Sequence, residues 1–67
     1  MAKWYAFEYD ERDDVTVYDS FHDAKFHVDS QNLTRVAEGL YRHNRIWIGT
    51  KKALIKNGFE NVRFVKA

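Results

Sequence analysis

The eleven aromatic side chains of this 67-residue chain most constrain what it can fold into. A chain this short buries only about 60% of its unfolded surface, so it needs large core side chains or a covalent or metal staple. The sequence contains no cysteine, which excludes a disulfide framework and a thiolate zinc site. A buried aromatic ring removes about 150–250 Å² from water. We therefore expect most of the rings to form the core of one domain over residues 1–67, with self-association as a second source of stability.

The first half of the chain predicts an antiparallel hairpin followed by an ambiguous segment. Residues 3–9 place apolar side chains on both faces of an extended segment, which is typical of a strand inside a sheet. Residues 10–14 are five charged side chains in a row and predict a solvated loop, and residues 15–21 predict the antiparallel partner strand. Residues 22–30 fit either a helix with Ser20 as its N-cap or a strand, and we favour a short helix or an irregular turn.

The second half carries the clearest helical pattern. Apolar side chains recur at the i, i+3, i+4, i+7 and i+8 spacing of one helix face, at Leu33, Val36, Ala37, Leu40 and Tyr41. Ser30 is the expected N-cap, and the helix is expected to end near residues 42–44. Gly39 costs a helix up to about 1 kcal/mol relative to alanine, which favours close packing at that position.

The remaining elements follow from local signals. Residues 45–48 predict a short strand, and residues 51–57 predict a second helix with Thr50 as its N-cap. Gly58 is expected to take the left-handed conformation, so that the next residue folds back on the last turn in a Schellman motif. Residues 61–66 predict a final strand.

The element order is therefore β-β-(uncertain)-α-β-α-β, and the expected fold class is α+β. We expect a single small sheet, built from the N-terminal antiparallel hairpin and one or two further strands, with two helices packed on one face. The longest apolar run, residues 4–7, is far shorter than a membrane span. Because no export signal is recognised either, we expect a cytoplasmic protein without a membrane partner.

Charge is divided unevenly along the chain. Residues 1–33 carry three basic and eight acidic side chains, a net charge of −5, and residues 34–67 carry eight basic and two acidic ones, a net charge of +6. Such asymmetry bears on partners and association rather than on fold. The two halves either neutralise each other or form a bipolar surface.

Two sets of candidate contact residues follow from this layout. A helix N-terminus with basic side chains attracts phosphate. The candidate phosphate or nucleic-acid contacts are Thr50, Lys51, Lys52, Lys56, Arg42, Arg45 and Arg63. Exposed aromatic residues in a charged rim are typical of protein interfaces. The candidate protein contacts are Tyr9, Trp47, Asp10, Glu11, Asp13 and Asp14.

Catalytic and cofactor signatures are not found in the sequence. His22, His27 and His43 do not have the spacing of metal ligands, and the two serines, Ser20 and Ser30, have no triad or elbow context. We therefore expect no enzyme, no cofactor, no metal and no small-molecule substrate. The function predicted first is a non-catalytic protein-interaction module, an accessory regulator or inhibitor of a larger complex, or a homodimer. It would act through a sheet edge or an aromatic and charged surface. The alternative is a nucleic-acid-binding domain that uses the basic C-terminal half.

Overall fold

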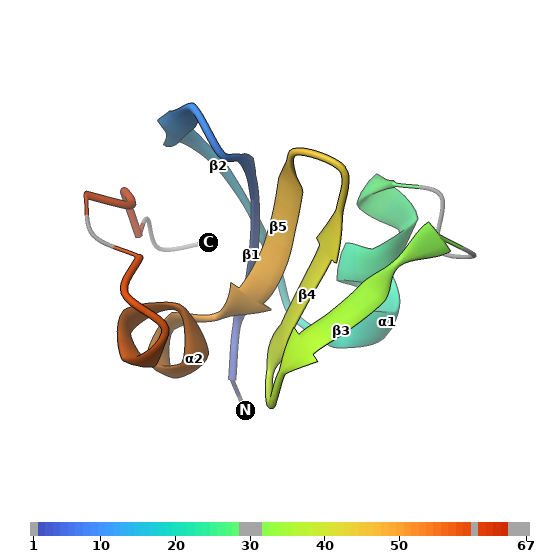
Figure 1. Cartoon of the computed structure of the whole chain (residues 1–67). Coiled ribbons are helices and arrows are strands. Elements are labelled where there is room, and N and C mark those ends of the chain that lie inside the picture. The colour runs from blue at the N-terminus through green and yellow to red at the C-terminus, as the bar shows by residue number, and fades with distance from the viewer. Residues whose placement is uncertain (1, 29–31, 60, 65–67) are drawn as a thin grey trace.

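The computed structural model of the chain describes residues 2–28, 32–59 and 61–64. Its five strands form one antiparallel sheet in the order β2-β1-β5-β4-β3 (Figure 1), which confirms the α+β class and the single sheet. The sheet has more strands than the sequence predicted. The elements are β1 (Trp4–Glu8), β2 (Glu11–Tyr18), α1 (Phe21–Ala24), the 3₁₀ helix η1 (Lys25–His27), β3 (Thr34–Ala37), β4 (Leu40–His43), β5 (Ile46–Thr50) and α2 (Lys51–Lys56).

The N-terminal hairpin is confirmed, and β1 lies inside the sheet between β2 and β5. The predicted loop over residues 10–14 is wrong, because β2 already begins at Glu11. Asp13 and Asp14 lie exposed on this edge strand. A strand at the edge of a sheet tolerates charged side chains that point to water, and such charges also discourage pairing with another chain. The charge run therefore marks an edge strand rather than a loop.

The ambiguous segment begins with a helix. Ser20 has extended backbone angles, and its hydroxyl accepts a hydrogen bond from the Asp23 N–H at 3.1 Å. This is the expected N-cap, and it starts α1 at Phe21, which the sequence had assigned to the preceding strand. The chain then continues through η1. The second expected N-cap, Ser30, lies outside the described residues.

The helix predicted from Leu33 to residues 42–44 is wrong, because this segment forms the β3–β4 hairpin. Ala37 and Leu40 are paired across the turn, and Gly39 there has a φ of +76°. Only glycine takes such an angle without a steric penalty from Cβ. Gly39 therefore closes a hairpin turn. The close packing expected there is also found, because a Cβ at Gly39 would lie 3.2 Å from the Cβ of Ala53.

The predicted strand at residues 45–48 is confirmed as β5, and α2 follows it directly. The Thr50 hydroxyl accepts a hydrogen bond from the Ala53 N–H at 3.2 Å, so Thr50 is the N-cap of α2. At the other end Gly58 has a φ of +85°. Its N–H bonds to the Ile55 carbonyl, and the next N–H bonds to the Leu54 carbonyl. These two bonds form the predicted Schellman motif.

The final strand is not observed within residues 61–64, and residues 65 and 66 lie outside the described part of the chain. Val62 and Phe64 both pack against the core. The Arg63 N–H donates to the Arg12 carbonyl at 2.9 Å, which ties this segment to the outer side of β2.

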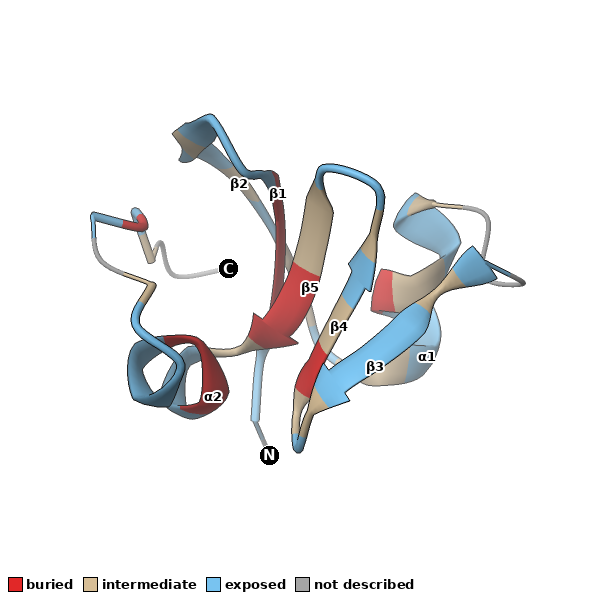
Figure 2. Ribbon diagram, viewed as in Figure 1, coloured by how far each residue is buried: buried red, intermediate tan, exposed pale blue. Residues whose placement is uncertain are grey.

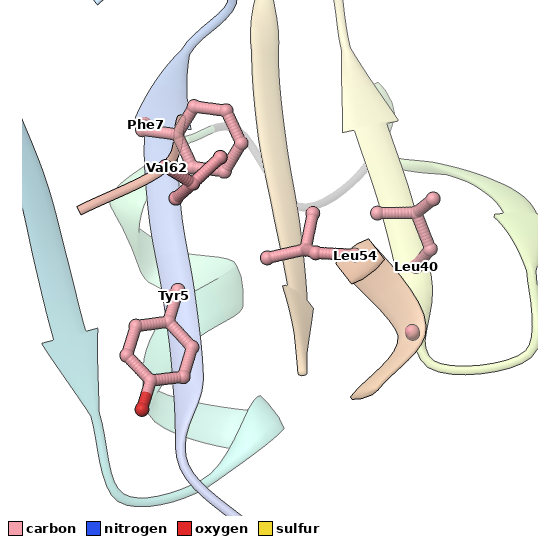
Figure 3. Packing of buried hydrophobic residues seen from close by; sticks show 6 residues of the cluster. Tyr5, Phe7, Leu40, Leu54 and Val62 are labelled. Atoms are coloured by element: carbon pink, nitrogen blue, oxygen red, sulfur yellow. The ribbon is translucent and has the colours of Figure 1, made fainter. Parts of the chain in front are cut away.

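The two helices cover opposite faces of the sheet, which corrects the prediction that both pack on one face. On one face Ala53 and Leu54 of α2 pack with Tyr5 and Phe7 (Figure 3). On the other face Ala24 of α1 packs with residues of β1 and β5 in a smaller cluster. The buried positions follow β1, β5 and the inner side of α2 (Figure 2). Because β1 is apolar on both faces, each face needs its own cover.

Candidate functional site

Two open hollows of about 280 Å³ each lie on the α2 face, near opposite ends of β5. We call the first the turn hollow because the β1–β2 and β4–β5 turns border it. It is lined by Tyr9, Asp10, Arg42, Asn44, Arg45 and Trp47. The second is the α2 hollow, lined by Glu38, Gly39, Thr50, Lys52, Ala53 and Lys56. A five-residue strand spans about 13 Å at 3.3 Å per residue, so the two hollows are separate sites.

A row of three rings and two guanidinium groups runs from the turn hollow across the end of this face. We call it the arginine–aromatic surface; its members are Tyr9, Arg12, Arg42, Trp47 and Phe59. The Arg12 guanidinium carbon lies 4.9 Å from the centre of the Tyr9 ring and 5.2 Å from that of Phe59. The Phe59 and Trp47 rings are 4.7 Å apart, and the Arg42 guanidinium lies 5.7 Å from Trp47. The three guanidinium–ring distances are within the range of cation–π attraction, and the ring–ring distance is typical of an aromatic pair.

Backbone contacts bring the two turns beside the turn hollow together. The Tyr9 N–H donates to the Arg45 carbonyl at 2.8 Å, which continues the β1–β5 pairing past the end of β1. The Asp10 carboxylate forms an ion pair with the Arg45 guanidinium across the same junction. A left-handed residue, Asn44 with φ +53°, turns the chain back into β5. Backbone hydrogen bonding and the left-handed Asn44 therefore fix the position of the two turns, and these turns place the charged side chains of Asp10 and Arg45 at the hollow.

Burial differs along the arginine–aromatic surface. Tyr9 is 50% exposed, and Arg42 is exposed. Trp47 and Phe59 are partly buried and pack against the main core through Phe7, whose ring lies 5.8 Å from Phe59. Arg12 also donates from Nε to the Tyr9 carbonyl at 3.2 Å. The inner members are thus fixed by the core, and the outer members face solvent.

The structure combines residues from the two sequence-based sets in one place. Tyr9, Asp10 and Trp47 came from the candidate protein contacts, and Arg42 and Arg45 came from the candidate phosphate contacts. All five line the turn hollow. The sequence could not show this, because residues near 10 and near 45 meet only through the pairing of β1 with β5.

The other candidate phosphate contacts lie elsewhere. Lys52 and Lys56 line the α2 hollow together with Glu38, whose carboxylate opposes an anion there. The Thr50 hydroxyl is engaged as the α2 cap, and α2 has only six residues. The ammonium group of Lys51 lies 5.4 Å from the Phe64 ring. The structure does not gather these residues with Arg42 and Arg45 into one basic site.

The remaining candidates flank these sites. Arg63 is exposed, and its backbone bonds to β2. Glu11, Asp13 and Asp14 are exposed on β2 and lie outside the turn hollow. Strands β4 and β3 of the basic second half lie at the opposite end of the sheet from β2, whereas Arg63 of the same half lies beside β2. The ion pair between Asp10 and Arg45 joins the two halves of the chain directly.

The sheet edges differ in their accessibility. The β2 edge is engaged at Arg12, whose carbonyl accepts the Arg63 N–H. The other edge is β3, where Thr34, Arg35 and Val36 are exposed. The β3–β4 register shifts between Arg35 and Ala37, and such an irregularity disfavours pairing with a further strand.

Sequence reasoning missed two members of the arginine–aromatic surface, Arg12 and Phe59. Arg12 is the single basic residue within the acidic run at residues 10–14, and that isolation was the available signal. Phe59 was assigned only to the end of α2. It does follow the Schellman motif, but its ring extends onto Trp47 and Phe7.

Ionisation and metal binding add little at these sites. A hydrogen bond from Lys3, and then its positive charge, lower the pKa of the exposed Asp19 carboxyl below its ordinary value of 3.8. That ion pair between Lys3 and Asp19 lies at the far end of β2, after Tyr18.

Within residues 2–28, 32–59 and 61–64, no three histidine or acidic side chains cluster as metal ligands do. The helices of these same segments are all too short and too polar to cross a bilayer.

Comparison with known proteins gives no relative. No family model matches the sequence, no curated protein matches it, and no solved structure matches the chain.

Proposed function

We propose that this protein is a non-catalytic binding module that presents the arginine–aromatic surface to a protein partner. The observation that supports this most is the row of rings and guanidinium groups from Tyr9 to Arg42 at an open hollow. Tryptophan, tyrosine and arginine are the residue types that dominate the binding energy of protein interfaces. A small domain of this kind suits the role of an accessory regulator of a larger complex.

The construction of the surface also favours a protein partner. Its inner rings are held by the core, so little side-chain entropy is lost when a partner covers them. Its rim carries both charge signs in Asp10 and Arg45, which favours a partner with complementary polar groups. The β3 edge is the weaker candidate because its pairing register is irregular.

Nucleic-acid binding is the alternative. It is supported by the exposed basic side chains of Arg42, Lys52 and Lys56. Single-strand binders, however, stack bases on open aromatic faces. Here a guanidinium group already lies over Tyr9 and another over Trp47, and Phe59 contacts Trp47 as well. The arrangement therefore favours protein binding.

The test compares two double variants with matched chemistry on the two faces of the sheet. Tyr9→Ser with Arg42→Gln alters the arginine–aromatic surface. Phe26→Ser with Arg35→Gln removes the same kinds of group elsewhere, since Phe26 is 66% exposed in η1 and Arg35 is paired with Tyr41. Each immobilised protein is used to capture binding proteins from an extract of the cells that produce it.

We expect the wild type and the Phe26/Arg35 variant to retain the same proteins, and the Tyr9/Arg42 variant to lose them. Nuclease treatment of the extract separates direct protein binding from capture through nucleic acid. Equal capture by both double variants would contradict the proposal, and capture abolished by nuclease would favour the alternative.

A further inference from the structure

We infer that the partner segment recognised by the arginine–aromatic surface is an acidic peptide, with one of its carboxylates held by Arg42 in the turn hollow. This inference rests on the proposed function and names the chemistry of the partner. Three observations support it: the position of Arg42, the ion pair between Asp10 and Arg45 in the hollow, and the guanidinium groups that lie over the Tyr9 and Trp47 rings.

Arg42 is arranged to receive an anion. Its side chain is exposed at the hollow and makes no ion pair within the described part of the chain. Its guanidinium lies 5.7 Å from the centre of the Trp47 ring. A guanidinium that stacks on a ring uses its flat face for that contact and retains the N–H groups at its edge. Those edge donors match the two oxygens of a carboxylate.

The hollow already contains one carboxylate–guanidinium pair, formed by Asp10 and Arg45. Both side chains are well exposed, at 60% and 65%, so the pair exchanges readily with an outside competitor. A second carboxylate on the same peptide would compete with Asp10 for Arg45. The chain thus shows with its own residues the kind of contact that the partner would make.

A peptide fits this surface better than a nucleic acid strand. Guanidinium groups bind phosphate and carboxylate with the same geometry, so charge alone does not separate the two. The rings separate them, because both Tyr9 and Trp47 carry a guanidinium where a base would stack. A carboxylate needs only the guanidinium edge and leaves these contacts in place.

The experiment is a ¹H–¹⁵N titration of the full chain with three probes. The first is a short glutamate-rich peptide, the second is the same peptide with glutamine at every glutamate, and the third is an oligothymidylate of similar charge. The resonances followed are the Trp47 indole N–H, the Arg42 side-chain N–H and the Tyr9 amide. We expect these to shift with the glutamate peptide, and to respond weakly to the other two.

Matched substitutions then assign the effect to Arg42. Arg42→Gln is expected to weaken binding of the glutamate peptide about tenfold or more, the loss of a charged hydrogen-bonding partner. Arg35→Gln makes the same charge change on the neighbouring strand β3. Arg35 is paired with Tyr41, which stacks on Phe21, so this position lies on the α1 face and away from the turn hollow. The substitution is expected to leave affinity within about twofold, as screening of exposed charges dictates.

A second pair of variants tests the competition with Asp10. Asp10→Asn frees Arg45 and is expected to tighten binding severalfold. Asp19→Asn is the control, because it removes one negative charge from another exposed ion pair, with Lys3, and frees a cation away from the hollow. If both variants tighten binding equally, the effect is one of net charge, and the assignment to Arg45 is overturned.

The outcomes distinguish this inference from the proposed function. Equal shifts with the glutamate and glutamine peptides, or none with either, overturn the acidic-peptide inference. Loss of protein capture by the Tyr9/Arg42 variant would then still support a protein-binding surface of other chemistry. Shifts with oligothymidylate alone would overturn the inference in favour of nucleic acid.

Discussion

The two faces of the sheet are covered in different ways. On the α1 face the rings cover one another: Phe21 stacks on Tyr41 at 4.4 Å, and Trp4 lies 4.9 Å from Phe21. On the α2 face, α2 covers the sheet around Leu54 together with Phe59, Val62 and Phe64, and Leu54 and Val62 are labelled in Figure 3. Beyond them, at the arginine–aromatic surface, guanidinium groups lie over the rings instead of further apolar side chains.

This difference determines which polar groups each face leaves at the surface. Rings that pack against other rings make their contacts within the fold and contribute to its stability. Rings that pack against arginine keep a charged group with spare N–H donors at the surface. The rings of the α1 face therefore engage one another, and the outer end of the α2 face combines core packing with exposed N–H donors.

The largest effect is expected from removing the cover of the α2 face. Leu54 is fully buried, and Leu54→Ala is expected to cost about 2–5 kcal/mol of unfolding free energy. Ile55 is the matched control on the same helix, because it is 56% exposed, and Ile55→Ala is expected to change stability by about 0.5 kcal/mol or less. Urea denaturation measures both. Equal losses would show that α2 does not pack as described.

A smaller effect separates close packing from backbone strain at two glycines. A Cβ at Gly49 would lie 2.9 Å from Leu40 Cδ1 and 3.3 Å from Leu54 Cγ, so Gly49→Ala is expected to cost about 1–3 kcal/mol by overpacking. Gly58 has open space around it but a φ of +85°, so Gly58→Ala is expected to cost about 1–2 kcal/mol. Asparagine tolerates this backbone angle. Gly58→Asn should therefore recover part of the loss at Gly58, and Gly49→Asn should recover none.

The cation–π contact between Arg42 and Trp47 is expected to contribute less to the free energy of unfolding. Arg42→Gln removes the guanidinium 5.7 Å from the ring and is expected to cost about 0.5–1 kcal/mol. It should also shift the indole N–H resonance of Trp47 without displacing that of Trp4. Arg35→Gln serves as the control, with a stability change of about 0.5 kcal/mol or less and no indole shift. An unchanged Trp47 resonance in Arg42→Gln would mean that the cation does not cover the ring.

The smallest effect concerns the exposed ion pair between Lys3 and Asp19. Lys3 lowers the pKa of the Asp19 carboxyl in the folded state, so the pair stabilises the fold above the ordinary carboxyl pKa of 3.8. That contribution is lost as the pH falls through the lower folded value. Thermal unfolding of the wild type and Asp19→Asn should therefore differ slightly at neutral pH and converge in acid. A gap that persists well below pH 3.8 would mean that protonation of Asp19 does not control this contribution.

The misassigned segment shows where sequence reasoning failed. Leu40 and Tyr41 were placed on one helix face, but in β4 they point to opposite faces, Leu40 into the α2-face core and Tyr41 toward Phe21. A strand covered on both sides is apolar on both sides, so its pattern does not alternate and can match helical spacing. Gly39 is both a turn residue and closely packed, and the sequence analysis recognised only its packing.

Most residues of the turn hollow were named from the sequence, but in two unrelated sets. Tyr9, Asp10 and Trp47 carried aromatic and acidic signals, and Arg42 and Arg45 carried a basic one. Their assembly required the pairing of β1 with β5, which are separated by three other strands in the chain. Arg12 and Phe59 joined the surface through ring contacts that no local pattern predicts.

The sequence by itself determined the features that depend on neighbouring residues: the first strand, the Ser20 and Thr50 caps, and the Schellman turn at Gly58. Each of these involves hydrogen bonds or backbone angles within a few residues, where the local side chains decide the energy. The tertiary structure alone decided that residues 34–43 are strands, that the helices lie on opposite faces, and that two turns form one hollow. These features depend on burial against distant segments, and in a small domain that energy outweighs the modest local preferences.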